Sequence, residues 1–475
     1  MAVAAIAAAV TVVAAQTRGA GASPQPRAPQ AAQGTGAFVA VQAPVVALEH
    51  VRVIDGTGAP PLEDQTVVIA AGKIAALGQS GQVAVPAAAR RLDLTGRSVI
   101  PGLVGLHEHL FYPNPDDAAL YKVHRFSFPR LYLAGGVTTA RTGGTFEPLT
   151  DLAIKKEIDE GRAIGPKLLV TAGYMDGRPL STPQMSEVST PQQARQFVER
   201  WAAQGAHSFK VYRHIPRLAL AEAVRAAHER GLTVTGHLCS VSFREAAELG
   251  IDNLEHGFVE ASDWVFAKQP DECSEDQPHE FAALDIDSPK VKALITTLVE
   301  KHVAITSTLA VTELPEPSAR FRAALEPETL ERYLARRRQT VGLGLVTFED
   351  SRKEVALERA FVAAGGLLVA GCDPTGDGQV LPGFGDQRNV EMLVAGGFSP
   401  LEAIRIATLN GAQFLGLQAS VGSIAVGKQA DLVVLDGNPA QRIEDIERVV
   451  TVFKDGVGWD AAALVASVNG LVGLR

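Results

Sequence analysis

Cysteine, basic charge and long apolar runs are all scarce in this chain of 475 residues. Its three cysteines, Cys239, Cys273 and Cys372, are too few for a disulfide framework, and we expect buried thiols. The net charge of −9, with no basic patch, argues against nucleic acid as a partner. No apolar run reaches the length of a membrane-spanning helix, so we expect no span. With 46% hydrophobic and 20% charged residues, the composition is that of an ordinary globular protein.

The first 45 residues differ in composition from the rest. Residues 2–15 form an uncharged apolar run that is too short to cross a bilayer as a helix. The run ends in small residues, Val13, Ala14 and Ala15, which suit a signal peptidase. We therefore predict a signal peptide at 1–15, a disordered linker at 16–45, and export to the periplasm or the medium. A disordered Ala-rich tail is the alternative.

The most informative segment follows an apolar run at residues 98–104 that reads as a buried strand. It carries His107 and His109, which share one strand face while Glu108 points the opposite way. Two neighbouring imidazoles suit one divalent metal ion. The pair would lie at the carboxyl end of its strand, where active sites of (β/α)₈ barrels are found.

Four further residues lie in or at the ends of later apolar strands: Lys210, His237, His256 and Asp373. The first three are separated by roughly 20–30 residues, close to the repeat of one strand and one helix in such a barrel. Each histidine alone could be a core residue. Their shared position at strand ends indicates a common metal site.

Short β-rich runs separated by turns occupy both flanks of this region. We predict an α/β fold: a (β/α)₈ TIM barrel at 101–415, a composite β-sandwich from residues 46–100 and 416–460, and a C-terminal tail at 461–475. Residues 262–288 and 311–340 fall outside the barrel repeat and are candidate substrate lids or oligomer contacts.

The ordered set of two histidines, lysine, two histidines and aspartate resembles the amidohydrolase superfamily. Residues 399–408 and 422–436 agree, and the resemblance covers roughly residues 46–458. Within the superfamily the chain is most similar to the imidazolonepropionase-like group, which includes Xaa-Pro dipeptidases, carboxypeptidases and ochratoxin-hydrolysing enzymes. Gly105 and Thr142 stand where many relatives have aspartate, which leaves the substrate open.

The resemblance implies two divalent metal ions, with zinc expected. His107 and His109 would bind the first ion and His237 and His256 the second. Carbon dioxide would convert Lys210 into a carbamate that bridges both. Asp373 would be a metal-site residue and the general base, taking a proton from a metal-bridging hydroxide and passing it to the leaving nitrogen.

Tyr212 and Arg213 are predicted substrate-binding residues, because Tyr212 lies two positions after Lys210. We expect an amide hydrolase of dipeptides or N-acyl amino acids, with small-molecule substrates as partners and a homo-oligomeric assembly. A cyclic amidase or heterocycle deaminase, and a non-catalytic binding protein on a degenerate barrel, are the alternatives.

Overall fold

The computed structural model describes residues 35–114, 117–274, 277–313, 318–342, 348–374 and 380–473. The predicted signal peptide lies outside these residues, as does the predicted linker up to residue 34. The rest of that linker was wrongly expected to be disordered. It contains η1 (Gly36–Phe38) and β1 (Val39–Val41), and β1 pairs antiparallel with β21 (Val457–Asp460). Backbone pairing to a distant strand orders this segment in spite of its composition.

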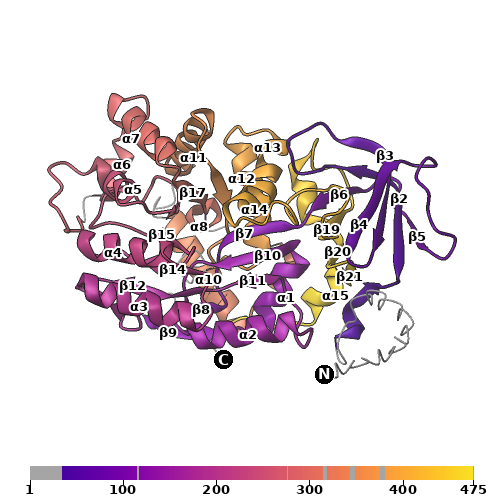
Figure 1. The fold of residues 1–475 in the computed structure, drawn as a ribbon, viewed down its shortest axis with the longest axis horizontal. Coiled ribbons are helices and arrows are strands. Elements are labelled where there is room, and N and C mark those ends of the chain that lie inside the picture. The colour runs from indigo at the N-terminus through magenta and orange to yellow at the C-terminus, as the bar shows by residue number, and fades with distance from the viewer. Residues whose placement is uncertain are drawn as a thin grey trace, which may run out of the picture.

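Strands from both ends of the chain form one nine-stranded mixed sheet, drawn in indigo and yellow in Figure 1. Its order is β1-β21-β20-β19-β6-β2-β3-β4, with β5 paired to β2. The remaining members are β2 (Val45–Val53), β3 (Leu62–Ala70), β4 (Lys73–Gln79), β5 (Arg90–Asp93), β6 (Ser98–Pro101), β19 (Leu432–Leu435) and β20 (Val449–Lys454). The two flanks thus meet as expected in one β unit with its own apolar core. Its arrangement as a sandwich stays a prediction.

The middle of the chain forms two parallel sheets. One has the order β11-β10-β7 and the other β13-β12-β14-β15-β16-β17-β18. Their strands are β7 (Leu103–Glu108), β10 (Val137–Thr142), β11 (Lys167–Leu169), β12 (Thr171–Asp176), β13 (Ser186–Glu187), β14 (Ser208–Val211), β15 (Thr233–Gly236), β16 (Asn253–Glu255), β17 (Ala304–Ser307) and β18 (Leu368–Ala370). A short hairpin, β8 (Phe111–Asn114) and β9 (Asp117–Val123), follows β7.

Hydrogen bonds join the two parallel sheets at two places. The amide of Asp373, just after β18, donates to the carbonyl of His107 in the edge strand β7 at 2.9 Å. Elsewhere the amide of Thr171 in β12 donates to the hydroxyl of Thr142 in β10 at 2.8 Å. These single bonds do not extend the ladder, so the strand pairing alone does not establish a closed barrel. They do bring the carboxyl ends of β7 and β18 together.

Helices alternate with the parallel strands and cover their outer side (Figure 1). They are α1 (Ser127–Ala134), α2 (Pro148–Asp159), α3 (Pro191–Ala203), α4 (Arg217–His228), α5 (Phe243–Glu248), α7 (Pro289–Glu300), α11 (Phe348–Ala363), α12 (Phe384–Ala395), α13 (Pro400–Arg405), α14 (Gly411–Phe414) and α15 (Ala461–Ala466). Apolar residues on one helical face pack into a core that runs through the whole unit. No helix of the described ranges has the length and hydropathy to cross a bilayer.

The described residues of the two stretches outside the repeat include helices. Residues 262–288 contain η2 (Ser262–Trp264) and α6 (Gln277–Ala282). The stretch 311–340 contains α9 (Ala319–Arg322) and overlaps α8 (Leu309–Glu313) and α10 (Pro327–Gly342). The junction of α9 and α10 docks on the C-terminal tail, where the amide of Glu326 donates to the carbonyl of Val472 at 2.8 Å.

The apolar run at 98–104 is two strands and not the single strand expected from its hydrophobicity. The chain leaves the mixed sheet after β6 and enters the parallel sheet at β7. Between them the amide of Gly102 donates to the carbonyl of Asp431 at 2.9 Å. A β-carbon at Gly102 would collide with the side chain of Thr138. A glycine therefore lets one segment connect the two parts of the molecule.

We predict that Gly102→Ala lowers the free energy of unfolding by about 1–3 kcal/mol, because the added methyl group overpacks a buried junction. Urea unfolding followed by circular dichroism measures it. Gly36→Ala is the matched control, since a β-carbon there would meet nothing within 4 Å. Equal stability of the two variants would contradict this account of the junction.

Candidate active site

His107 and His109, at the end of β7, both direct their Nε2 atoms toward Asp373. Their Nδ1 atoms are held by hydrogen bonds. Nδ1 of His107 lies 2.7 Å from Oε2 of Glu255, and Nδ1 of His109 lies 3.0 Å from the carbonyl oxygen of Gly144. A carbonyl or a carboxylate can only accept, so both Nδ1 atoms donate. This fixes the tautomer and leaves both Nε2 atoms with a free lone pair, the form in which histidine binds metal ions.

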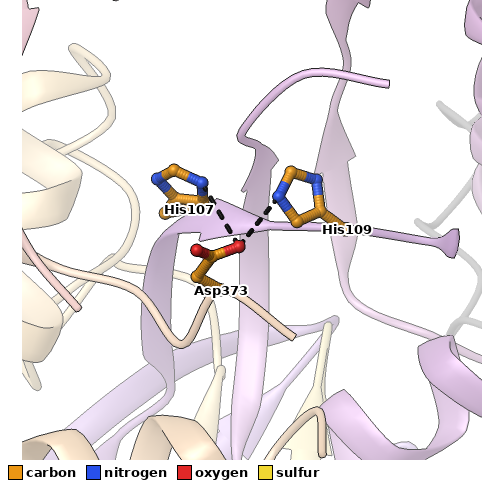
Figure 2. A group of neighbouring side chains, drawn as sticks. All are labelled: His107, His109 and Asp373. Atoms are coloured by element: carbon orange, nitrogen blue, oxygen red, sulfur yellow. Dashed lines mark ion pairs between the residues drawn. The ribbon is translucent and has the colours of Figure 1, made fainter. Parts of the chain in front are cut away.

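Asp373 faces these two nitrogens from the end of the last parallel strand (Figure 2). Its Oδ1 atom lies 3.0 Å from Nε2 of His109 and 3.5 Å from Nε2 of His107. The ligand atoms of all three residues lie within 4.8 Å of one another. Asp373 has a φ of 47°, a left-handed conformation that is rare outside glycine. That backbone turn directs the carboxylate back over the strand ends.

His256 and His237 line the same cavity. The His256 ring centroid lies 4.6 Å from those of His107 and of His237. Nδ1 of His256 lies 2.9 Å from the hydroxyl of Thr308 and 3.7 Å from Oδ2 of Asp373. Nε2 of His237 lies 3.2 Å from Oε2 of Glu260. The four predicted histidines therefore converge, and Glu260 is an acidic neighbour that the sequence did not single out.

Lys210 lies in β14 beneath these rings with 1% of its surface exposed. Its nearest carboxylate oxygen, Oε1 of Glu255, is 3.8 Å away, and its Nζ atom has no hydrogen-bond partner among the described residues. Burial lowers the pKa of Lys210 to about 8, although Glu255 and Asp373 oppose the shift.

This donor set fits divalent metal ions. Nζ of Lys210 and Oδ1 of Asp373 are buried polar atoms without hydrogen-bond partners in the described structure. Both atoms lie among histidine side chains, and imidazole is a ligand shared by zinc and its neighbours. Unpartnered buried polar atoms are costly, and ligation would satisfy them.

Glu255 is hydrogen-bonded to this cluster through His107, and the sequence analysis did not identify it. Its carboxylate accepts from Nδ1 of His107, from Nη2 of Arg141 at 2.7 Å and from the hydroxyl of Thr235. Both Glu255 and Arg141 have no exposed surface. Interactions with Lys210, His107 and Arg141 hold the pKa of Glu255 well below its usual range, although burial alone would raise it. A charged residue next to His256 in a predicted strand was the available signal.

The site opens into a cavity of about 560 Å³. Tyr212 and Arg213, the predicted substrate-binding residues, both line it. The Tyr212 ring centroid lies 4.7 Å from that of His237 and 5.4 Å from that of Tyr174. Further rings continue this wall, namely Phe111 and Phe146. The wall is therefore largely aromatic.

Cys239 and Cys273 form a disulfide, so the expectation of buried thiols was wrong for this pair. Cys239 lies two residues after His237, and Cys273 belongs to the 262–288 insertion. Nη2 of Arg213 lies 3.7 Å from the sulfur of Cys273. The bond thus ties the insertion to the rim of the cavity. Cys372 is a buried free thiol, as expected.

Histidines, a lysine and an aspartate at the ends of parallel strands are typical of enzymes that use divalent metal ions. The model of the Amidohydrolase family matches residues 98–458 of this chain. The chain belongs to the amidohydrolase family, and imidazolonepropionases are among the proteins that it resembles. It is an enzyme that acts on carbon–nitrogen bonds. The family generally uses divalent metals, and its structures imply a TIM-barrel fold.

Among curated relatives, an imidazolonepropionase of Herpetosiphon aurantiacus is 24% identical over 397 residues, 78% of this chain and 84% of that protein. A 5'-deoxyadenosine deaminase of Methanobrevibacter smithii is 48% identical over 44 residues, 9% of this chain and 10% of that protein. An imidazolonepropionase of Mycolicibacterium smegmatis is 37% identical over 97 residues, 20% of this chain and 23% of that protein. The chain thus spans less than a quarter of these last two relatives.

Among solved structures, a Bifidobacterium longum protein described as a candidate prolidase has a TM-score of 0.62 at 26% identity. The match covers 89% of this chain and 98% of that one. A Xaa-Pro dipeptidase with bound methionine in its active site has a TM-score of 0.64 at 19% identity, covering 88% of this chain and 100% of that one. At 19% identity, the second likeness concerns the fold alone.

We predict that Glu255→Gln lowers the free energy of unfolding by roughly 3–5 kcal/mol, because it leaves the buried charge of Arg141 without its anion. Urea unfolding measures the loss. Glu63→Gln removes the carboxylate of an ion pair with Arg52 whose glutamate is 64% exposed, and should cost less than about 1 kcal/mol. A loss of less than about 1 kcal/mol for Glu255→Gln as well would show that the buried ion pair of Glu255 and Arg141 adds little to stability.

We predict that peptides containing Cys239 and Cys273 are recovered as one linked species from a digest of the non-reduced protein. Reduction should separate them. Cys372 should resist alkylation until the protein unfolds, because it is buried. Mass spectrometry checks both points, and recovery of the first two cysteines as free thiols in the folded protein would contradict the pairing.

Proposed function

We propose that this enzyme is a binuclear metal-dependent hydrolase that cleaves the amide bond of small substrates such as dipeptides or N-acyl amino acids. The observation that carries the proposal is the convergence of four imidazoles, Lys210 and Asp373 on one cavity. These residues come from the ends of five parallel strands in two sheets, so the cluster depends on the packing of both sheets and not on one local motif.

His107 and His109 would hold one ion, and His237 and His256 the other, with zinc as the expected metal. A carboxylated Lys210 would supply the bridging anion. Such ions provide an activated water nucleophile and polarise a carbonyl oxygen. The absence of any hydrogen-bond partner for Nζ among the described residues supports the carbamate, since no hydrogen bond of Lys210 has to be broken to form it.

Asp373 is the proposed general base and acid. It would take the proton of the attacking water and deliver it to the leaving nitrogen. The histidines hold the pKa of Asp373 below its usual range against the effect of burial, so its carboxyl group is deprotonated, the form that a general base requires. Its left-handed backbone holds the carboxylate at one position over the strand ends.

Tyr212 and Arg213 would orient the substrate. Burial raises the pKa of Tyr212, so its phenol stays protonated and can donate to a carbonyl oxygen. Arg213 can bind a carboxylate in bidentate fashion. The aromatic wall offers contact to an apolar side chain. Together these groups suit a small amide that carries both an apolar group and a carboxylate.

A cyclic amidase or deaminase of a heterocycle is the second candidate. The imidazolonepropionase relative, which matches over 78% of this chain, favours it. Against it stands Lys210, because a single-metal enzyme has no use for a bridging carbamate. Turnover of lactams, with no turnover of linear amides, would select this alternative.

Export remains part of the proposal. The Cys239–Cys273 disulfide supports it, since disulfides persist in oxidising compartments and are rare in the cytosol. Assembly into a homo-oligomer stays a prediction from the sequence.

We predict that Asp373→Asn lowers kcat by roughly 10²–10⁴-fold, because general acid–base catalysis is worth about that much. Purified enzyme supplied with zinc and bicarbonate would be assayed on Xaa-Pro dipeptides, N-acyl amino acids and lactams, with metal content measured in parallel. Two metal ions per chain should remain in the variant. Wild-type enzyme that holds metal but cleaves none of these amides would contradict the proposed function.

A further inference from the structure

Two glutamates on α11 form a wall of the cavity that no proposed catalytic step uses. Glu354 and Glu358 lie one helical turn apart, so both side chains project from the same face of the helix. Both line the cavity that also contains His107 and Asp373. Glu354 is 3% exposed and Glu358 has no exposed surface. Buried carboxyl groups are rare without a partner or a ligand.

Each carboxyl group uses one oxygen to hold the ends of the parallel strands. Oε1 of Glu354 accepts from the amide of Phe258 at 2.7 Å, and the amide of Val259 also faces this carboxyl group. Oε2 of Glu358 accepts from the hydroxyl of Ser307 at 3.1 Å. Oε2 of Glu354 and Oε1 of Glu358 are buried and have no hydrogen-bond partner within the described ranges. Leaving such buried acceptors without a hydrogen bond is energetically unfavourable.

The described part of the chain supplies no cation to this pair. The adjacent Lys353 turns away and donates to the carbonyl oxygens of Phe281 and Ala282. The electrostatic neighbours of the pair are themselves acidic, because Glu260 acts on Glu354 and Glu354 acts on Glu358. Burial and this repulsion raise the pKa of Glu354 to about 8 and that of Glu358 well above its usual range.

Gly257 leaves the space that these carboxyl groups occupy. It has a φ of 65°, and a β-carbon there would collide with Oε1 of Glu354 and lie 3.2 Å from Oε1 of Glu358. The loop after β16 thus packs directly on the two carboxyl groups. The pair is therefore part of the built wall of the cavity beside His256, and not a solvated helix surface.

We propose that Glu354 and Glu358 form a subsite for an ammonium group of the substrate. The inference rests on the proposed hydrolase function and narrows it to small amides that carry a free amine. Their two unpartnered oxygens supply the acceptors, and a primary ammonium group supplies three donors and the missing positive charge. With Arg213 available for a carboxylate, the cavity suits a zwitterionic dipeptide better than an N-acyl amino acid.

The ammonium group could be the α-amine or the end of a lysine side chain, and three probes separate these sources. They are leucyl-proline, N-acetyl-leucyl-proline and N-acetyl-lysyl-proline. Binding is measured by isothermal titration calorimetry on the zinc-loaded Asp373→Asn protein, so that no turnover is needed. The ratio of kcat/KM for leucyl-proline and its N-acetyl form is measured separately on wild-type enzyme.

We predict that leucyl-proline binds about ten- to hundredfold more tightly than its N-acetyl form, as expected for a charge-assisted hydrogen bond. Adding Glu358→Gln should bring this ratio close to one, because the amide keeps an acceptor for Ser307 but cannot take the negative charge that a bound ammonium group would stabilise. Glu199→Gln, which removes a negative charge on the 45% exposed Glu199, is the control and should leave the ratio unchanged.

The outcomes distinguish the two proposals. Binding that favours the free amine, together with no hydrolysis of any amide, would overturn the proposed function and keep the subsite. Hydrolysis with equal affinity for both leucyl probes would overturn an α-amine subsite, and tight binding of the N-acetyl-lysyl probe would then assign it to a side-chain ammonium group. Weak, equal binding of all three probes, or a ratio unmoved by Glu358→Gln, would overturn the subsite altogether.

Discussion

One buried carboxylate, that of Glu255, sets the charge balance on which the rest of the site depends. It accepts from Arg141 and His107 at 2.7 Å each, while the amine of Lys210 stays 3.8 Å away. The short contacts consume most of its capacity as an acceptor. Arg141 therefore stays charged and paired, and Lys210 is the cation left poorly compensated in a buried site. Conversion of Lys210 into an anion would cost little of this network and would balance two bound dications.

Strand geometry alone would not bring these side chains together. Alternation along β16 directs Asn253 and Glu255 to the same side, where Asn253 accepts from Thr235 and Thr306 at 3.0 and 3.1 Å. By the same rule His256 should point away. It reaches the cavity because its φ is 66°, a left-handed turn just past the strand. Asp373, just after β18, has the same left-handed backbone conformation, with a φ of 47°. Strained backbone at two of the six predicted metal-site residues is consistent with positions held by function and not by local preference.

These two turns explain what could be predicted from the sequence and what could not. Apolar runs with polar residues at their ends were enough to find Lys210 and the four histidines, because that pattern depends only on strand periodicity. Glu255 was missed because alternation appeared to place it opposite His256. The split between β6 and β7 was missed, because hydrophobicity does not show which sheet a strand joins.

Long-range pairings were beyond any local pattern. Cys239 and Cys273 are 34 residues apart, and their bond exists only because the 262–288 insertion folds back over β15. Glu354 and Glu358 looked like the polar face of an amphipathic helix, and only the packing of α11 against the loop after β16 buries them. In both cases an element following one strand completes a site built on another. The candidate metal site is thus largely encoded in strand ends, whereas the cavity around it is defined by contacts between insertions and helices. Substrate choice should therefore vary among relatives of this fold more readily than the chemistry does.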